Sequence, residues 1–475
     1  MTVVCQKSIS LPRNVGIARR GGGCGIIIVV LKFVFGWTEK DMKLQLALFD
    51  EPLVDLSVVS DLKTARSGTF LDNMVLPVHR WFRYSAGFAA EWVGQVLDDW
   101  QIGAEQVVLD PFAGSGTVPV VCDNGRIRSV AVDAHPMVAR ICKAKLSWST
   151  PVERFTDFAG AVIRRAQGVE RSQIVHSSLI QRSFDADTLA ALDCLKAAWL
   201  TLDDGSPESE LVWLALTAIL RPTSSAGTAQ WQYILPSKTK SKVVAPQLAF
   251  QRQLEVMKSD MRWMQARVDS SMAKLFGGDA RSLSAFVDQK VDAVITSPPY
   301  ANNYDYADAL RFEMTFWDEV AGWGDIHDKV RKYLIVSSSQ HSSRERLVLE
   351  HLLDSDEVAP VRAELSAITH QLESVREEHG GKKHYHTMVA AYCRDIALVL
   401  RQLRQVGKPG MHMCWVIGDS APYGVYAPIE RWIGELALAA GFTSFRFEKL
   451  RDRNIKWKNR KHRVPLKEGL LWIEG

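Results

Sequence analysis

The stretch "QVVLDPFAGSGT", residues 106–117, decides how the rest of the chain is interpreted. Its apolar start predicts a short buried strand, and its end predicts the beginning of a helix. Gly114 and Gly116 lie between the two, where glycine lets the backbone turn sharply and lets a ligand approach closely. Open α/β sheets bind their ligands beyond the carboxyl ends of strands, so this turn predicts a ligand site.

Elements predicted on either side of this unit alternate between helix and strand. An amphipathic helix is predicted at residues 86–100, and another at 427–442, which Gly441 ends. Further strands are predicted at 129–136, at "VDAVI" (291–295), at 411–420 and in the closing "GLLWIE". This alternation predicts an α/β fold with a mostly parallel sheet and helices on both faces.

Two stretches depart from the alternating pattern and divide the chain. Residues 151–275 carry long helical patterns without a clear strand, and a second helical insert is predicted near 324–385. The sheet-forming parts are then 42–150 and 276–475. Residues 1–41 are interpreted as a dispensable extension, because Met42 opens a plausible start.

The composition of the chain limits which classes of protein it can belong to. The 475 residues carry a formal net charge of only +4, so local clusters rather than bulk charge must indicate partners. Seven scattered cysteines with no Cys-x-x-Cys pair argue against disulfide and zinc frameworks and fit a reducing cytoplasm. The apolar run at 24–37 is interrupted by Lys32 and is too short to span a bilayer comfortably, so no membrane partner is expected. No metal site is predicted, since His384 and His386 are isolated.

The residues near the glycine turn limit which ligands this site can bind. Pro119 occupies the third-glycine position of the dinucleotide fingerprint, and the Gly-Lys-Ser/Thr of a P-loop is absent. Asp133 ends the next strand, about where an acid binds a ribose diol, and Asp279 follows "GG" at the next unit. Together they suit an adenosine without phosphates, which indicates S-adenosylmethionine. Alternatively, Asp133 caps the helix near Pro136 and Asp279 is an ordinary turn residue.

A second motif, "TSPPY" at residues 296–300, follows the strand at 291–295. Adjacent prolines remove two backbone donors and stiffen the chain. The segment is therefore suited to holding backbone carbonyls and one aromatic ring in fixed positions.

In this order, "DPFAGSGT" and "TSPPY" resemble the amino-methyltransferases that act on exocyclic amines of DNA bases, the cytosine-N4 and adenine-N6 enzymes. The resemblance extends to "HRWFRYSAGFAAEWV", to "YCRDIALVLRQLRQVGKPGMHMCWVIGDS" and to "PLKEGLLWIE", and covers roughly residues 75–150 and 276–475. It implies a Rossmann-like methyltransferase fold with a mostly parallel seven-stranded sheet. Residues 151–270 resemble nothing specific.

The family's functional residues transfer by position in these motifs. The resemblance implies that the methionine part of S-adenosylmethionine contacts Asp110, Phe112, Ala113, Gly114, Ser115, Gly116 and Thr117, with Phe88 as a pocket wall. It implies that Asp133 binds the ribose and Asp279 the adenine amine. Ser297, Pro298, Pro299 and Tyr300 would hold the target base, and Phe88 is alternatively a core residue.

The chemistry explains why such an enzyme needs a Ser-Pro-Pro-Tyr segment. A base amine is a poor nucleophile because its lone pair is delocalised into the ring, and acceptors on its hydrogens help to localise it. Ser297 Oγ and the Pro298 carbonyl suit that role, while Tyr300 offers a ring face to a base flipped out of the duplex. In the family that the chain resembles, serine before the prolines goes mostly with cytosine, so the resemblance favours cytosine N4 over adenine N6. An RNA amino-methyltransferase and a non-catalytic binding module are weaker alternatives.

Double-stranded DNA is the expected partner. Residues 446–467 hold ten Lys and Arg residues against Glu448 and Asp452, so phosphate contact is favoured over a merely solvated surface. The predicted contact residues are Arg453, Lys456, Lys458, Arg460, Lys461 and Arg463. The insert at 151–275 is the candidate target-recognition region. A cognate restriction nuclease or another defence protein is a second candidate partner.

Overall fold

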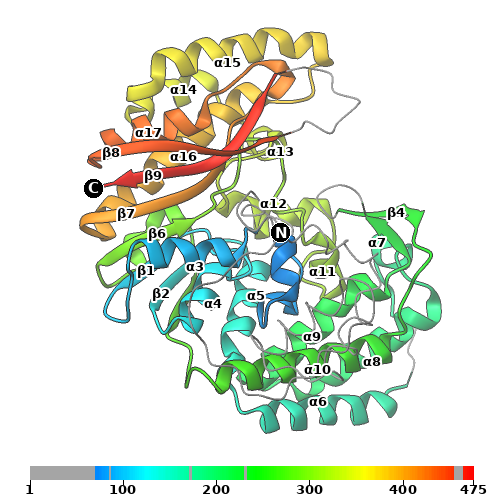
Figure 1. Ribbon diagram of the computed structural model, residues 1–475. Helices are drawn as coiled ribbons and strands as arrows, with labels where there is room; N and C mark the ends of the chain where they lie inside the picture. Colours follow the sequence, from blue (N-terminus) through cyan, green and yellow to red (C-terminus); the bar gives the residue numbers. More distant parts are fainter. Residues whose placement is uncertain (1–69, 85–86, 171–173, 229–232, 454–463) are drawn as a thin grey trace, which may run out of the picture. The chain divides into compact units, whose positions relative to one another are not determined.

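The computed structural model describes residues 70–84, 87–170, 174–228, 233–453 and 464–475. The predicted extension at 1–41 lies outside the described residues. Within them, one seven-stranded sheet organises the chain (Figure 1). Its strands run in the order β5 (Ala273–Gly277), β2 (Arg128–Asp133), β1 (Val107–Asp110), β6 (Val291–Thr296), β7 (Gly407–Gly418), β9 (Leu466–Glu474) and β8 (Ser444–Arg453).

The sheet is parallel from β5 to β7, and β9 runs antiparallel to both of its neighbours. Asp110 is paired with Ala131 of β2, and Asp133 is paired with Gly277 of β5. The carboxyl ends of these strands therefore meet at one edge of the sheet. The predicted Rossmann-like α/β fold with a mostly parallel seven-stranded sheet is confirmed.

Two strands, β5 and β8, were not predicted from the sequence. Both lie at the outer edges of the sheet, and none of the residues of either is fully buried. Edge strands face solvent and are often charged, so they lack the apolar signal that marks a central strand. The charged run at 446–453 is therefore strand β8 rather than an unstructured surface segment.

Helices cover both faces of the sheet because the side chains of each strand alternate. Leu109 of β1 and Trp415 of β7 pack towards α16 (Tyr385–Val406) and α17 (Ile429–Ala439). Val108 and Val416, one residue away on the same strands, pack towards α3 (Ala90–Asp99) and α4 (Thr117–Asn124). Helix α5 (Pro136–Leu146) packs beside β5 and β2.

Residues 152–265 form a helical segment that packs on α5 and on the chain before α3. Its helices are α6 (Val152–Gln167), α7 (Ser178–Gln181), α8 (Ala186–Leu202), α9 (Pro207–Thr223) and α10 (Pro246–Gln265). Asp185 and Ser206 cap α8 and α9 by accepting from backbone N–H groups, as N-cap residues do. A strand pair, β3 (Ala226–Thr228) and β4 (Ile234–Thr239), lies in this segment, for which the sequence predicted no clear strand.

A buried ion pair fixes this helical segment to the residues that precede α3. The Arg80 guanidinium contacts the Asp260 carboxylate of α10, and the Trp81 indole N–H donates to the same carboxylate at 2.9 Å. Arg80 and Asp260 are both almost fully buried. Arg80 therefore has a structural partner and does not offer its charge to a phosphate.

A second group of helices lies between β6 and α16. It comprises α11 (Arg311–Phe316), α12 (Trp323–Lys329), α13 (Ser339–Arg344), α14 (Leu349–Leu353) and α15 (Arg362–Arg376). Leu365 and Leu372 of α15 are fully buried, as their helical spacing predicts, and α15 packs along α16. Short 3₁₀ helices complete the described elements at Phe70–Val75, His79–Trp81, Ser147–Ser149, Ala280–Ala285, Arg331–Tyr333, Asp356–Val361, Glu377–His379 and Pro422–Gly424.

No helix within the described ranges combines the length and the apolar character needed to cross a bilayer. The described cysteines, Cys122, Cys142, Cys194, Cys393 and Cys414, are all free thiols.

Candidate active site

The glycine turn between β1 and α4 is held in a conformation that only glycine adopts easily. Gly114 and Gly116 have φ angles of 54° and 88°, in the left-handed region. A Cβ added to Gly116 would lie 2.8 Å from Cys142 Sγ, so the neighbouring helix leaves no room for a side chain. The turn thus brings backbone close to the sheet edge, where a ligand can contact it.

Asp133 fastens this turn to the end of β2. Its Oδ2 accepts from Gly114 N and its Oδ1 accepts from His135 N, both at 2.8 Å. Each oxygen keeps a second lone pair that a ribose hydroxyl can use. Burial raises the pKa of Asp133 to about 6, although the two backbone hydrogen bonds oppose the rise. The helix-cap alternative fails, because the carboxylate bonds the N-cap residue His135 itself rather than a residue of the first turn of α5.

Asp279 lies in the turn after β5 and is already engaged by a neighbour. Its Oδ1 accepts from Arg281 N at 2.8 Å, and the Arg281 guanidinium contacts both carboxylate oxygens. Arg281 also donates to the fully buried Asp395 at 3.0 Å. The predicted contact of Asp279 with an adenine amine must therefore use a lone pair that Arg281 leaves free.

The Ser-Pro-Pro-Tyr segment begins where β6 ends. Thr296 Oγ1 donates to Asp110 Oδ1 at 2.6 Å, which links the two motifs at adjacent strand ends. Ser297 Oγ donates to the Val416 carbonyl of β7 at 3.2 Å, so its lone pairs remain available as acceptors. The Tyr300 N–H donates to Tyr306 Oη at 3.1 Å, and the Tyr300 ring lies 5.3 Å from the Arg453 guanidinium.

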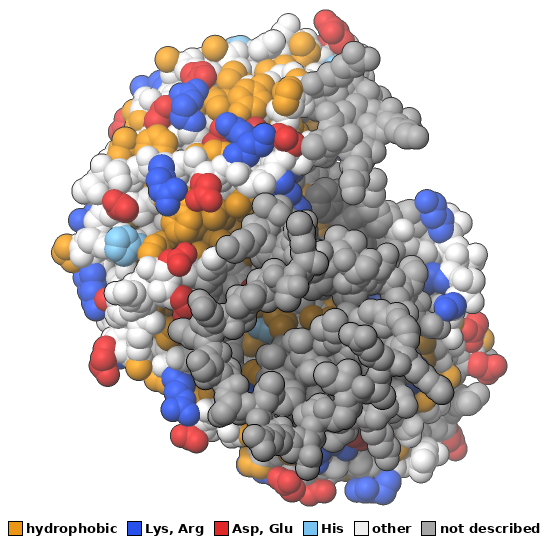
Figure 2. Space-filling view, in the orientation of Figure 1, with side chains coloured by type: hydrophobic (Ala, Val, Ile, Leu, Met, Phe, Trp, Pro, Cys, Tyr) orange, Lys and Arg blue, Asp and Glu red, His pale blue; other side chains and the backbone are white. Residues whose placement is uncertain are grey.

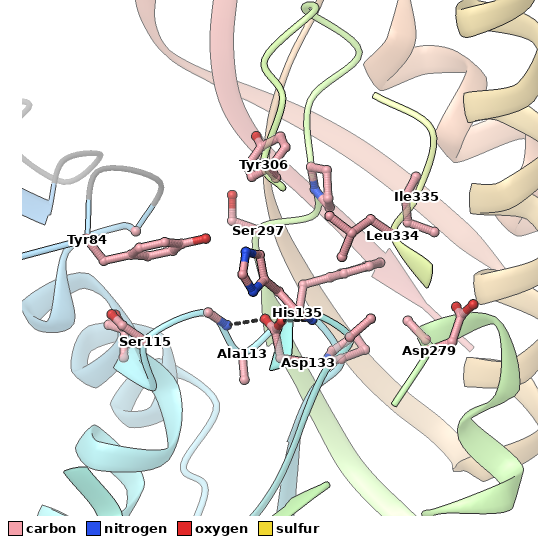
Figure 3. Close-up of a pocket in the computed structure, with 18 of the residues that line it drawn as sticks. Tyr84, Ala113, Ser115, Asp133, His135, Asp279, Ser297, Tyr306, Leu334 and Ile335 are labelled. Carbon is pink, nitrogen blue, oxygen red and sulfur yellow. Dashed lines mark hydrogen bonds between the residues drawn. The ribbon is translucent and has the colours of Figure 1, made fainter. Parts of the chain in front are cut away.

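A single pocket collects most of the residues that the sequence singled out (Figure 3). The predicted residues that line it are Phe88, Phe112, Ala113, Gly114, Ser115, Thr117, Asp133, Asp279, Ser297 and Pro299. Asp110, Gly116, Pro298 and Tyr300 do not line it; they lie behind or beside the residues that do. The glycine turn and the Ser-Pro-Pro-Tyr segment therefore open onto one space.

Asp110 does not line the pocket but bonds Phe112, which does. It is almost fully buried, and its Oδ1 accepts from the Thr296 hydroxyl and from Phe112 N. Burial raises the pKa of Asp110 to about 7, partly offset by these two hydrogen bonds. Asp110 therefore fixes the turn and the end of β6, and its contact with the cofactor stays a prediction.

Sequence reasoning missed several lining residues: Tyr84, His135, Tyr306, Tyr333, Leu334 and Ile335. The sequence could have indicated His135, because it follows Asp133 by two residues in "VDAHP". Tyr333 to Ile335 belong to the helical insert near 324–385, which carries no motif, so no signal in the sequence placed them here.

Only Arg453 of the predicted phosphate contacts is described, since Lys456, Lys458, Arg460, Lys461 and Arg463 lie outside the described residues. The Arg453 side chain is only 12% exposed. It donates to the Asp419 carbonyl at 2.9 Å and lies 3.7 Å from the Glu468 carboxylate. Arg453 therefore packs against the Tyr300 ring, whereas a phosphate contact would need its side chain at the surface.

Comparisons with known proteins find methyltransferases that align with most of this chain. The chain is 22% identical over 418 residues to the type II methyltransferase M.BsoBI of Geobacillus stearothermophilus, covering 79% of this chain and 81% of the relative. It is 21% identical over 404 residues to type II methyltransferases M.AvaI of Nostoc sp. strain PCC 7120 and of Anabaena variabilis, with the same coverages. No protein-family model matches the chain.

Among solved structures, the rRNA methyltransferase aviRa from Streptomyces viridochromogenes aligns over 89% of this chain and 94% of its own, with a TM-score of 0.27 and 11% identity. The similarity to methyltransferases over most of the chain, together with the sheet, identifies S-adenosylmethionine as the cofactor. The pocket fits this group, because the half-buried Asp133 carboxylate keeps lone pairs available beside a turn whose partly exposed backbone lines the same space.

Proposed function

We propose that this chain is a DNA methyltransferase that modifies the exocyclic amine of a flipped base, with cytosine N4 as the favoured target and adenine N6 as the alternative. The observation that carries the proposal is that Ser297 and Pro299 line the same pocket as Asp133 and the glycine turn. The similarity to type II methyltransferases, which aligns with 79% of this chain, supports the methyltransferase part of the proposal and does not bear on the choice of base.

The geometry assigns a role to each part of the pocket. When bound, S-adenosylmethionine supplies an electrophilic methyl group. Asp133 and the glycine turn hold it at the sheet edge, with Phe88 as a wall. Ser297 Oγ accepts a hydrogen bond from the target amine, since its own proton is directed to the Val416 carbonyl. This acceptor helps to localise the amine lone pair, so its benefit is largest as the amine attacks.

The choice of cytosine rests on serine before the two prolines, and the pocket does not by itself favour one base. The neighbouring tyrosines could stack on either ring, since every base has an apolar face. Serine at 297 therefore remains the reason to favour cytosine over adenine.

Contact with the DNA backbone is assigned to the basic segment at residues 446–467. In Figure 2, Lys and Arg side chains are interspersed with Asp and Glu over the described surface of this face. Replacing Lys456, Lys458, Arg460 and Lys461 by alanine should flatten the slope of log affinity against log salt by at most roughly 3.6. The helical segment within 151–275 is the proposed target-recognition region, and a cognate nuclease the proposed partner.

The deciding experiment expresses the chain in a bacterial strain that lacks its own DNA methylases. Mass spectrometry of the digested DNA should reveal N4-methylcytosine, which a Ser297→Ala variant should produce at a much lower rate while retaining cofactor affinity. N6-methyladenine without N4-methylcytosine would refute the choice of base. Methylated nucleosides in RNA alone would refute the choice of DNA.

A further inference from the structure

His135 is a pocket residue to which neither motif assigns a role. It lies between the end of β2 and the first residue of α5, Pro136, and occupies the N-cap position without capping the helix through its side chain. Both backbone groups of His135 are hydrogen-bonded. Its N–H donates to Asp133, and its carbonyl accepts from Ala139 N at 2.9 Å. Figure 3 shows its imidazole directed into the pocket that Tyr84 and Ser297 also line.

The imidazole is buried, and its interaction with the Ala307 backbone falls short of normal hydrogen-bond geometry. The residue is 3% exposed, and among the described residues neither ring nitrogen has a hydrogen-bond partner of normal geometry. Buried polar side chains in folded proteins nearly always have a partner, so two unsatisfied nitrogens in a ligand pocket indicate a group that a ligand completes.

The surroundings keep this imidazole neutral. Burial lowers the pKa of His135 to about 4, although the backbones of Ala307 and of His135 itself oppose the shift. The start of α5 acts in the same direction, because the positive end of a helix dipole disfavours a cation. At neutral pH one ring nitrogen therefore carries a lone pair that can accept a hydrogen or a proton.

The titratable groups that share the pocket come from other elements. They are Tyr84 before α3, Asp133 at the end of β2, Asp279 after β5, Tyr306 after β6, and Tyr333. Beyond Ala307 the same loop carries Asp308, which is paired with Arg311 at 2.6 Å. Both oxygens of Asp133 already accept from backbone N–H groups, and the tyrosines are weak bases, which leaves His135 as the uncommitted acceptor.

We propose that His135 accepts the proton that the target amine loses during methyl transfer. This inference rests on the proposed function. The amine lone pair forms the new nitrogen–carbon bond to the methyl group, and the carbon–sulfur bond breaks with its electron pair remaining on sulfur. The methylated nitrogen then carries a positive charge and one proton too many. That proton passes to the imidazole lone pair, its N–H electron pair returns to nitrogen, and the imidazolium later releases the proton to water.

The low basicity of His135 suits this step. An amine cation conjugated to a base ring is a strong acid and gives its proton even to a weakly basic imidazole. Ser297 and His135 then divide the work: the serine hydroxyl accepts a hydrogen bond before attack, and the imidazole takes the proton afterwards.

The test compares His135→Gln and His135→Ala with the wild-type chain, using His341→Gln as a matched control. His341 is also buried, burial lowers its pKa to about 3, and it does not line the pocket. Cofactor affinity is measured by calorimetry. Single-turnover transfer is measured with methyl-labelled cofactor and genomic DNA from a methylase-free strain.

We expect both His135 variants to bind cofactor within about threefold of wild type and to lose roughly 10²-fold or more in transfer rate. Added imidazole should restore the rate of His135→Ala, and His341→Gln should transfer at the wild-type rate. Transfer by His135→Gln within about threefold of wild type would overturn the inference, as would a loss that imidazole does not restore.

A fall in cofactor affinity with an unchanged rate at saturating cofactor would make His135 a cofactor contact instead and would likewise overturn the inference. Wild-type chain that methylates no DNA would refute the proposed function itself. Active wild type with active His135 variants would refute only the role of His135.

Discussion

The two halves of the pocket are built in different ways. The cofactor half is held by backbone groups of nearby residues: Asp133 accepts from His135 two residues on and from Gly114, 19 residues back. The base half is held by distant side chains. Ser297 Oγ donates to a carbonyl 119 residues away, and Tyr233 Oη, just before β4, bonds the backbone of Asp305, 72 residues away.

Further contacts strengthen the contrast. The Arg331 guanidinium pairs with the Asp305 carboxylate at 2.7 Å, with both groups buried, and Ser337 Oγ donates to the Tyr304 carbonyl. Helical segments on either side thus hold the loop after the Ser-Pro-Pro-Tyr segment. The cofactor half therefore depends mainly on β1, the glycine turn and the end of the neighbouring strand β2, whereas the base half depends on contacts between residues far apart in the chain.

The largest effect is expected from Gly116→Ala, which disturbs the glycine turn of the cofactor half. A side chain at φ 88° with its Cβ 2.8 Å from Cys142 Sγ combines backbone strain with overpacking. We expect a loss of about 2–4 kcal/mol in the free energy of unfolding and a large loss of cofactor affinity. Denaturant unfolding and calorimetry measure the two. Gly103→Ala is the control, since nothing lies within 4 Å of a Cβ there and its φ is not in the left-handed region; equal effects at both positions would contradict the role of the turn.

Asp133→Ala should weaken cofactor binding by about 10- to 100-fold, the equivalent of about 1.5–3 kcal/mol, because a charged acceptor is lost. The ionised carboxylate is the better acceptor for ribose hydroxyls. Since the pKa of Asp133 is raised to about 6, wild-type affinity should rise as pH increases through 6. Asp133→Asn should lack this rise in calorimetry across pH 5 to 8. An identical pH profile in wild type and Asp133→Asn would remove the carboxylate from the site.

Asp110→Asn tests the junction between the halves. The folded-state pKa of Asp110, about 7, lies above its ordinary value of 3.8, so the native chain binds more protons than the unfolded chain between these pH values. Stability from this group is therefore present at low pH and is lost as pH rises towards 7, with a slope of up to about 1.4 kcal/mol per pH unit. Asparagine should flatten that slope in denaturant unfolding; an unchanged slope would assign the pH dependence to another group.

The smallest effect is expected from Tyr233→Phe, which touches the base half from the helical segment. It removes two weak hydrogen bonds of 3.3 Å to Asp305 and keeps the ring, which packs 5.6 Å from Tyr304. Transfer rate should fall by about 2- to 10-fold, with cofactor affinity unchanged. Loss of cofactor affinity in this variant would show that the halves are coupled more tightly than their contacts suggest.

The sequence by itself determined the central strands, the glycine turn and both motifs. Val107 to Asp110 and Val291 to Thr296 are apolar enough to require burial, and Gly114 and Gly116 mark a turn with positive φ that few other residues tolerate. These signals are local, because each depends on a few consecutive residues. Asp133 belongs with them: its position at a strand end is visible in the sequence, and it lines the pocket.

Tertiary structure alone decided the rest. The edge strands β5 and β8 form because a neighbouring strand offers hydrogen bonds, and their own residues carry no burial signal. Arg453 packs on Tyr300 although it stands in a basic run, and Tyr333 to Ile335 reach the pocket from a segment without a motif. A contact between residues far apart in the chain depends on how intervening helices pack, and no local pattern encodes that. His135 lies between these cases: its position in the sequence was plain, but only folding buries its imidazole in the pocket without a partner.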